Sequence, residues 1–165
     1  PNKCSKVVWS VPLATSAHIK VSRLSESKRI FFSGQEPAYA VKLFFVFKKA
    51  FWRVKFCGNA YFSQEFPFTE LIEVSPADLS CGILAFFFLA DKIKQWEDRF
   101  GEDYTTHQII ENKKKYALKV IADMFLEGNI DSPELQDVVM AERSYRHNKY
   151  IRSCYQSISK LGTTA

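Results

Sequence analysis

The stretch AVKLFFVFKKAFWRVKFCG, residues 40–58, decides which fold this chain can adopt. Apolar side chains occupy every second position of its first eight residues, which is the period of a β-strand. Phe44 and Val46 add apolar side chains on the opposite face, so we expect a central strand that is covered on both sides. A basic and aromatic corner around Trp52 leads to a second aromatic strand at residues 54–62. We predict that the two strands form a hairpin.

The length and composition indicate a single domain over residues 1–165. The chain is 47% hydrophobic and contains 15 phenylalanines, which is enough for a real core and argues against disorder. The net charge of +5 permits an acidic partner without demanding one. The apolar run 81–90 is about half the length of a membrane-spanning helix, so it predicts a buried strand. The four cysteines lack any CxxC pair, which favours reduced thiols and an intracellular location over a disulfide framework or a zinc site.

The two halves of the chain carry different periodicities. Apolar or alternating runs predict further strands in the first half, at residues 6–12, 69–74 and 81–89. In the second half, three- and four-residue spacings predict helices at 91–100 and 105–127, before a last strand at 135–141. We therefore predict an α+β fold, with a mixed, mostly antiparallel sheet of about five or six strands backed by two or three helices.

The longer predicted helix has clear end signals. Thr105 and Gln108 have the spacing of a capping box, and Gly128 with Asn129 makes a good C-terminal stop. The lysine run 113–115 is read as a solvated face of this helix.

Residues that carry catalysis by themselves are sparse in this sequence. The six glycines are scattered, so neither a GxGxxG turn nor another phosphate-binding loop is present. His18, His107 and His147 lack the spacing of metal ligands and are read as solvated or capping side chains. Cys154, seven residues after His147, is a conceivable nucleophile, but the sequence alone predicts a plain thiol there. We predict no metal site.

The corner at Lys48–Lys55 supports an alternative function. It interleaves basic and aromatic side chains, as proteins that bind single-stranded nucleic acids do. Only one such patch is present, and its aromatic residues could equally pack inward. A binding module that uses this corner on an acidic partner or nucleic acid is therefore the second hypothesis. An interaction domain without a ligand is the third.

Several segments, in order and spacing, resemble one enzyme family. The chain contains an apolar run that ends in Val-Pro, a Phe-Trp-Arg corner followed by Phe-Cys-Gly, a glycine-led apolar strand, and a tail with a Cys-Tyr pair: residues 6–12, 51–53, 56–58, 82–88, and 142–162 with Glu142, Tyr145, Tyr150, Cys154, Tyr155 and Gly162. Together they resemble the substrate-binding domain of flavin-containing amine oxidases, and of monoamine oxidases in particular. The resemblance covers nearly the whole chain.

The resemblance implies roles for four residues. Cys154 falls on the cysteine that carries a covalent thioether to the flavin, and Tyr155 falls on one wall of an aromatic cage that orients the amine. Tyr145 takes the place of a tryptophan that supports this cage. His18 takes the place of a lysine that holds a water near the flavin. The implied cofactor is FAD, and aromatic walls suit an amine that must be desolvated and aimed at the flavin ring.

The chain also departs from the family pattern. The two glycines before the family's cysteine are Arg152 and Ser153 here, although close approach of backbone to a flavin favours glycine. The proline of the Phe-Trp corner is Ala50. The family's N-terminal dinucleotide-binding glycines and C-terminal flavin-contacting segment have no counterpart in this sequence. We therefore expect a fragment that neither retains FAD nor turns over alone, and a degenerate, non-catalytic relative stays open.

The resemblance implies the following function and surroundings. The chain would be the substrate-binding part of an oxidase that deaminates amines with O2, giving an aldehyde, ammonia or an amine, and H2O2. Its partners would be a small amine and the remainder of the oxidase, with no nucleic acid. Membrane attachment would come only from a segment outside this sequence, and the family relationship points to the mitochondrial outer membrane for the full-length protein.

Overall fold

The computed structural model describes residues 5–6, 8–16, 18–55, 60–62, 64–101, 105–144, 151 and 157–159. The internal contacts of the chain define two compact units. The first unit combines Pro1–Tyr39 with Tyr145–Ala165, and the second unit is Ala40–Ser144. Each is described by itself. Whether both act as one substrate-binding segment, as the sequence suggests, stays a prediction.

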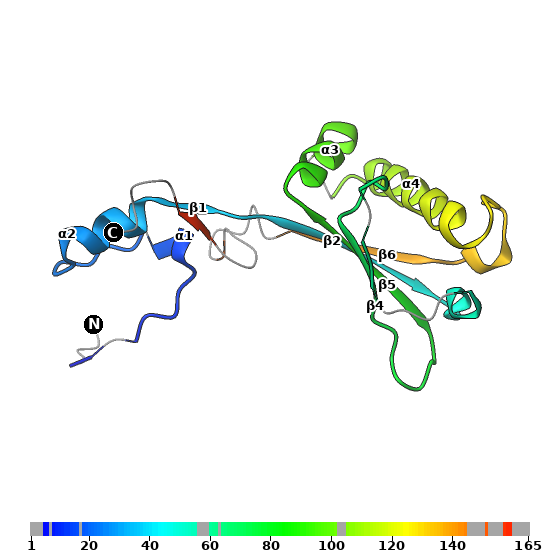
Figure 1. Ribbon diagram of the computed structural model, residues 1–165, viewed down its shortest axis with the longest axis horizontal. Coiled ribbons are helices and arrows are strands. Elements are labelled where there is room, and N and C mark those ends of the chain that lie inside the picture. Colours follow the sequence, from blue (N-terminus) through cyan, green and yellow to red (C-terminus); the bar gives the residue numbers. More distant parts are fainter. Residues whose placement is uncertain are drawn as a thin grey trace. The chain divides into compact units, whose positions relative to one another are not determined.

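The second unit is built on a five-stranded sheet in the order β3-β4-β5-β2-β6, and every pairing in it is antiparallel. Its strands are β2 (Ala40–Phe47), β3 (Ala60–Phe62), β4 (Glu70–Glu73), β5 (Gly82–Leu89) and β6 (Val139–Ser144). Helices α3 (Asp91–Phe100) and α4 (His107–Phe125) cover one face of this sheet (Figure 1). The α+β architecture expected from the sequence is confirmed.

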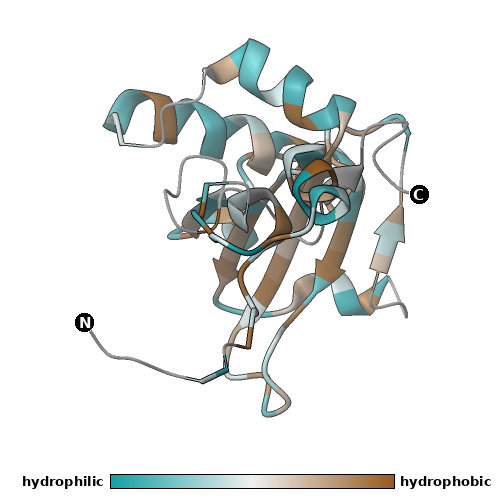
Figure 2. Ribbon diagram, turned by 90° about the vertical axis from the view of Figure 1, so that its left-hand side faces the viewer, coloured by the Kyte–Doolittle hydropathy of each residue, from teal (hydrophilic) through white to brown (hydrophobic). Residues whose placement is uncertain are grey.

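Strand β2 lies inside the sheet, between β5 and β6. Its odd-numbered residues from Val41 to Phe47 are buried, whereas Lys42, Phe44 and Val46 are half-buried. The expectation that both faces are covered is therefore met on one face only. Figure 2 shows the strands of the sheet mainly in the hydrophobic colour and the helices in a mixture of both colours.

The helix layer packs on the sheet through aromatic side chains. The rings of Phe88 on β5 and Trp96 on α3 have centroids 4.7 Å apart. Phe125 on α4 lies 6.3 Å from Trp52, which belongs to the short 3-10 helix η1 (Phe51–Val54). Trp52 in turn meets Phe47 at 5.2 Å. Large, well-buried rings of this kind supply much of the free energy that holds two layers together.

The ends of both helices follow their sequence signals, with one correction. Helix α3 ends at Gly101, whose φ of 76° is easily adopted only by glycine. Helix α4 ends at Phe125, with Leu126 as its C-cap, and Gly128, with a φ of 81°, donates its N–H to the carbonyl oxygen of Ala122. The predicted capping box is wrong, because the N-cap is Thr106 and makes no side-chain capping bond.

The first unit contains short elements. Helices α1 (Leu13–Ser16) and α2 (Glu26–Ser33) lie in its N-terminal part, and strand β1 (Gln35–Pro37) pairs antiparallel with β7 (Ser157–Ser159). Within this unit, Trp9 stacks on Phe32 with centroids 6.1 Å apart and donates its indole N–H to Ser16 Oγ at 2.8 Å. The hydroxyl of Thr15 donates to the carbonyl of Ile151 at 3.0 Å, which ties the two ends of the chain together.

Two strand predictions are wrong. The described residues of the 6–12 run form no strand, and α1 begins at Leu13 directly after Pro12. The predicted hairpin of residues 40–62 does not form, because β2 pairs with β5 and β6 while β3 pairs with β4. In both segments the local pattern is compatible with a strand, but it does not specify a partner.

Candidate functional site

Only one of the four sequence-predicted site residues lies among the described residues. His18 is exposed in a turn after α1, where its backbone N–H donates to the carbonyl of Thr15 at 3.1 Å. Tyr145, Cys154 and Tyr155 lie outside the described residues. Their proposed roles therefore stay predictions.

The basic corner after β2 is tied into the second unit by three ion pairs. Lys48 Nζ lies 2.6 Å from Asp137, Arg53 Nε lies 2.7 Å from Glu73, and Lys55 Nζ lies 2.8 Å from Glu127. These acids come from three different elements or loops, so the corner is held on several sides. A nucleic acid that used these cations would have to compete with the three carboxylates.

The aromatic residues of the same corner face the protein. Trp52 is 3% exposed and packs edge-on against Phe47 and Phe51. A buried indole cannot stack on a nucleotide base without unfolding the corner. This geometry leaves the alternative of a nucleic-acid module without its main stacking side chain.

The sheet face opposite the helices presents three rows of side chains that follow the strand register. Residues that are directly opposite in neighbouring strands share a face, so the register assigns each row. In the order β4, β5, β2, β6, one row is Glu70, Phe87, Lys42 and Arg143, and the next is Ile72, Ala85, Phe44 and Ala141. The third row is Ile83, Val46 and Val139 on β5, β2 and β6. We call this surface the open face.

The open face is apolar at its centre, where Ala85 is fully buried and the larger side chains are partly accessible. Phe44, Val46, Ile72 and Ile83 are half-buried, and Val139 is 63% exposed. Polar and charged side chains are confined to the row of Lys42. Small-molecule sites are lined mostly by apolar side chains with a few polar groups, and the open face has this composition.

Lys42 is fixed at the polar end of the open face by an aromatic ring. Its Nζ lies 4.6 Å from the centroid of Phe87, which is a cation–π contact. Arg143 is its directly paired neighbour on β6 and donates from its guanidinium to the carbonyl oxygen of Glu142 at 2.8 Å. Two cations therefore face each other across neighbouring strands.

A second charged pair is buried on the helix side of β6. Lys113 of α4 donates to both carboxylate oxygens of Glu142, at 3.1 and 2.9 Å, and the two side chains are 1% and 6% exposed. The prediction that the 113–115 run is a solvated face is wrong for Lys113. A signal was present in the sequence, because Lys113 stands four and seven residues before the buried Ala117 and Val120.

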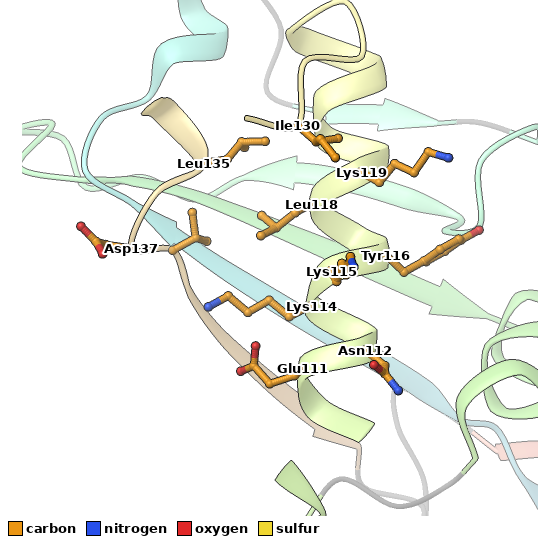
Figure 3. A pocket seen from close by; sticks show the side chains of 11 residues that line it. Glu111, Asn112, Lys114, Lys115, Tyr116, Leu118, Lys119, Ile130, Leu135 and Asp137 are labelled. Atoms are coloured by element: carbon orange, nitrogen blue, oxygen red, sulfur yellow. The ribbon is translucent and has the colours of Figure 1, made fainter. Parts of the chain in front are cut away.

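Figure 3 shows a groove beside α4, with a volume of about 640 Å3. Leu118, Ile130 and Leu135 provide apolar surface, while Lys114 and Lys115 are among the charged side chains that surround it. The groove contains no histidine, cysteine, serine or threonine. The groove shares no residue with the open face.

A smaller depression of about 520 Å3 lies between α3 and the 65–67 segment. Lys92 Nζ donates to the carbonyl oxygens of Gln64 and Phe66, at 2.8 and 2.7 Å, and so holds this segment on the helix. Arg99 lies over the ring of Tyr116, 4.4 Å from its centroid. These contacts give the depression a structural role.

Two further findings concern the described part of the chain. No three histidine, cysteine, aspartate or glutamate side chains of the described part lie close enough to hold a metal ion. In the same part of the chain, no helix has the length and apolar character needed to cross a membrane.

Comparison with known proteins gives likeness of structure without likeness of sequence. No family model matches the chain, and no curated protein sequence matches it. A solved putrescine oxidase with bound putrescine matches with a TM-score of 0.70 and 19% sequence identity, and a triple mutant of that enzyme matches with 0.70 and 20%. Cyclohexylamine oxidase from Brevibacterium oxydans IH-35A matches with a TM-score of 0.71 and 13% identity.

These matches cover almost all of this chain but only a part of each solved protein. In each case the match covers 93% of this chain but only 31% of the solved protein. The fold of this chain is therefore similar to about a third of each of these amine oxidases. At such low identity the likeness concerns the fold alone.

Proposed function

We propose that this chain is the substrate-facing part of a flavin-dependent amine oxidase. The main support is the fold, which matches amine oxidases over 93% of the chain. The open face adds a second argument, since apolar, half-buried side chains such as Phe44 and Ile83 are suited to line one wall of an amine pocket.

In this proposal the protein side chains orient and desolvate the amine. A flavin held by the remainder of the oxidase would supply the two-electron oxidation of the amine. The open face would exclude water around the carbon chain of the substrate, which lowers the dielectric near the reacting carbon and keeps the amine in place. The sequence resemblance adds Tyr155 as a cage wall, Tyr145 as its support, and His18 as a holder of water.

The described residues do not fit the phosphate part of FAD. The sequence has no glycine-rich loop whose N–H groups could bind a pyrophosphate. FAD would therefore be held by other parts of a longer oxidase, with Cys154 as the predicted covalent attachment. The isolated chain is expected to be inactive. Mitochondrial membrane attachment of the full-length protein remains a prediction from the sequence resemblance.

The proposal is tested with the full open reading frame that contains this chain. After expression, we expect a yellow protein that releases H2O2 with butylamine or putrescine, and a colour that survives acid precipitation but is lost in Cys154→Ala. A protein that binds flavin covalently yet oxidises no amine would indicate a degenerate relative. A colourless, inactive protein would contradict the proposal.

The contribution of the open face is tested by a matched pair of variants. Phe44→Ala removes a half-buried ring from the open face, while Phe45→Ala removes a fully buried ring from the opposite side. We expect Phe44→Ala to raise KM for amines while keeping a cooperative unfolding transition. Phe45→Ala should lower stability by about 3–5 kcal/mol, measured by urea unfolding. An unchanged KM in Phe44→Ala would remove the open face from the pocket.

A further inference from the structure

The groove beside α4 is formed by two segments of the second unit. One segment is the part of α4 at residues 111–119, and the other is the segment at residues 130–138. The volume of about 640 Å3 lies within the range of small-molecule sites. None of the residues that line the groove belongs to the open face, so the proposed oxidation of amines gives this groove no role.

One end of the groove is apolar and partly accessible. Leu118 is half-buried, Ile130 is 54% exposed, and the buried Leu135 lines the same space. Figure 3 shows these three side chains together at the end of the groove that lies towards the C-terminus of α4. An exposed isoleucine beside other apolar side chains is stabilised by a partner that removes its surface from water.

The loop that carries Ile130 is held by its own hydrogen bonds. The N–H of Asn129 donates to the carbonyl oxygen of Leu126 at 3.0 Å, and the N–H of Asp131 donates to Asn129 Oδ1 at 3.1 Å. The backbone on both sides of Ile130 is therefore ordered. A surface that is ordered before binding loses less conformational entropy when a ligand binds to it.

Two exposed cations lie beside this apolar end. Lys115 and Lys119 line the groove from successive turns of α4, because residues four apart lie on the same side of a helix. Within the described part of the chain, neither lysine forms an ion pair or a hydrogen bond through its ammonium group. Asp123, one turn after Lys119, has its carboxylate near Gly128 and does not line the groove. Like charges at this spacing disfavour a helix, and an anion bound between them relieves the repulsion.

Two carboxylates also line the groove, and neither neutralises these cations. Lys48 Nζ lies 2.6 Å from Asp137, and the hydrogen bond and charge of Lys48, with a smaller effect from Lys114, lower the pKa of Asp137. Glu111 is one turn before Lys115 but forms no ion pair with it among the described residues, and Figure 3 shows Glu111 at the end of the groove away from the apolar side chains. The apolar end of the groove therefore carries a surplus of positive charge.

We propose that this groove binds an apolar carboxylate, with the carbon chain on the apolar end and the carboxylate between Lys115 and Lys119. A carboxylate accepts hydrogen bonds from two ammonium groups at once, and such charge-assisted bonds are stronger than neutral ones. The volume of the groove favours a small molecule over a protein partner. The site does not depend on the proposed oxidase function, because α4 and the 130–138 segment form it by themselves.

The first test locates the binding surface. Octanoate is titrated into the isotope-labelled 165-residue chain while the amide NMR signals are followed. We expect saturable shifts of amides at residues 114–119 and 130–138 that fit one dissociation constant. Octylammonium has the same carbon chain and the opposite charge, so at equal ionic strength it should bind there at least about tenfold more weakly.

Two variants test the two parts of the site. Lys115→Gln/Lys119→Gln removes both cations and should raise Kd for octanoate by about tenfold, as expected for two exposed ion pairs. Ile130→Ala shortens an exposed apolar side chain and should raise Kd by about threefold. The matched control is Lys94→Gln, which removes an exposed lysine of α3 that does not line the groove and should leave Kd unchanged. All these side chains are exposed, so each variant should unfold at the same temperature as the wild type to within a few degrees.

Three results of these titrations would overturn the site. They are shifts that spread over the chain without saturation, an equal Kd in the wild type and the double lysine variant, and a preference for octylammonium. A calorimetric titration of the protein encoded by the full open reading frame completes the test. The same Kd there supports the site, whereas loss of binding would mean that another part of the longer protein occupies the groove and would overturn the proposal.

Discussion

Lys113 shows how much a single residue can contribute to the energetics of this fold. Its ammonium group and the carboxylate of Glu142 are both almost fully buried and are joined by two hydrogen bonds. Burial of two charges costs much of what their attraction contributes, so such a pair adds little net stability. Removal of one partner is different, since it leaves the other charge buried and uncompensated.

Lys113→Met is therefore expected to destabilise the chain by about 3–5 kcal/mol. The double variant Lys113→Met/Glu142→Leu should recover most of this loss, because neither charge then remains in the core. Urea unfolding of both variants measures the difference. Lys48→Gln, which breaks an ion pair whose side chains are 71% and 74% exposed, serves as the control and should change stability by less than about 1 kcal/mol. A double variant as unstable as the single one would contradict this account.

The carboxyl of Glu73 makes the stability of the fold depend on pH. Burial raises the pKa of the Glu73 carboxyl. Hydrogen bonds from Ser75 and Arg53, together with the charge of Arg53, lower this pKa by more than burial raises it, so it lies below its usual 4.5. The indole N–H of Trp52 lies near this carboxylate but outside hydrogen-bond geometry, so Ser75 and Arg53 are the partners to consider. A depressed pKa means that folding favours the ionised form.

The stabilisation by Glu73 is thus fully present above pH 4.5 and is lost as the pH falls through the lower pKa of the folded state. Glu73→Gln should remove this part of the acid sensitivity. Urea midpoints measured between neutral and strongly acidic pH should converge for wild type and variant at the acid end. Asp137 and Glu127 also have lowered pKa values, owing to Lys48 and Lys55, but they titrate in both proteins and cancel in the comparison. Parallel curves would exclude a role for Glu73.

At the scale of elements, β5 depends on one glycine. A Cβ at Gly82 would lie 2.7 Å from backbone atoms of Lys49 and Ala50, closer than any side chain tolerates. The first residue of β5 therefore lies against the backbone of the corner after β2, and only glycine is small enough for this position.

Gly82→Ala should force the corner and β5 apart and destabilise the chain by about 1–3 kcal/mol, the usual effect of overpacking. Gly101→Ala is a useful comparison, because a Cβ there meets nothing within 4 Å and only the positive φ opposes it. That variant should lose about 1 kcal/mol. Thermal unfolding of both proteins measures the two effects, and an equal or smaller loss in Gly82→Ala would refute the steric argument.

The same elements show what a sequence can and cannot predict. Helix α3 was predicted with its correct bounds, because an apolar strand precedes it and Gly101 ends it. The pairing of β2 was mispredicted, since alternation specifies a strand and its faces while partners depend on contacts far along the chain. Helix α2 was missed because its apolar residues Ile30, Phe31 and Phe32 are consecutive, so the three- and four-residue spacing that indicates a helix is not visible.

The candidate site divides in a similar way. Lys42 and Phe44 could be placed on one face from the sequence, but the facing of Lys42 and Arg143 depends on the register between strands about 100 residues apart. The roles of Cys154 and Tyr155 come from family resemblance and stay predictions.

At the scale of the whole molecule, the second unit should fold by itself. Its core, from Val41 to Val138, is made by its own residues, and its sheet is complete between Ala40 and Ser144. A chain of residues 40–144 should therefore show a single cooperative urea transition and mixed helix and strand signals by circular dichroism. A non-cooperative transition would mean that the first unit is needed for folding.

The pairing of Val41 with Ser144 has one more consequence. The polypeptide enters and leaves the second unit through residues that are neighbours in the sheet. The second unit is therefore arranged like an inserted domain, or cassette, with both ends at one place. A cassette joined at two neighbouring seams can be exchanged for another without rebuilding its surroundings. In the proposed oxidase, such an exchange would replace the wall that contacts the substrate and leave the flavin-binding parts unchanged.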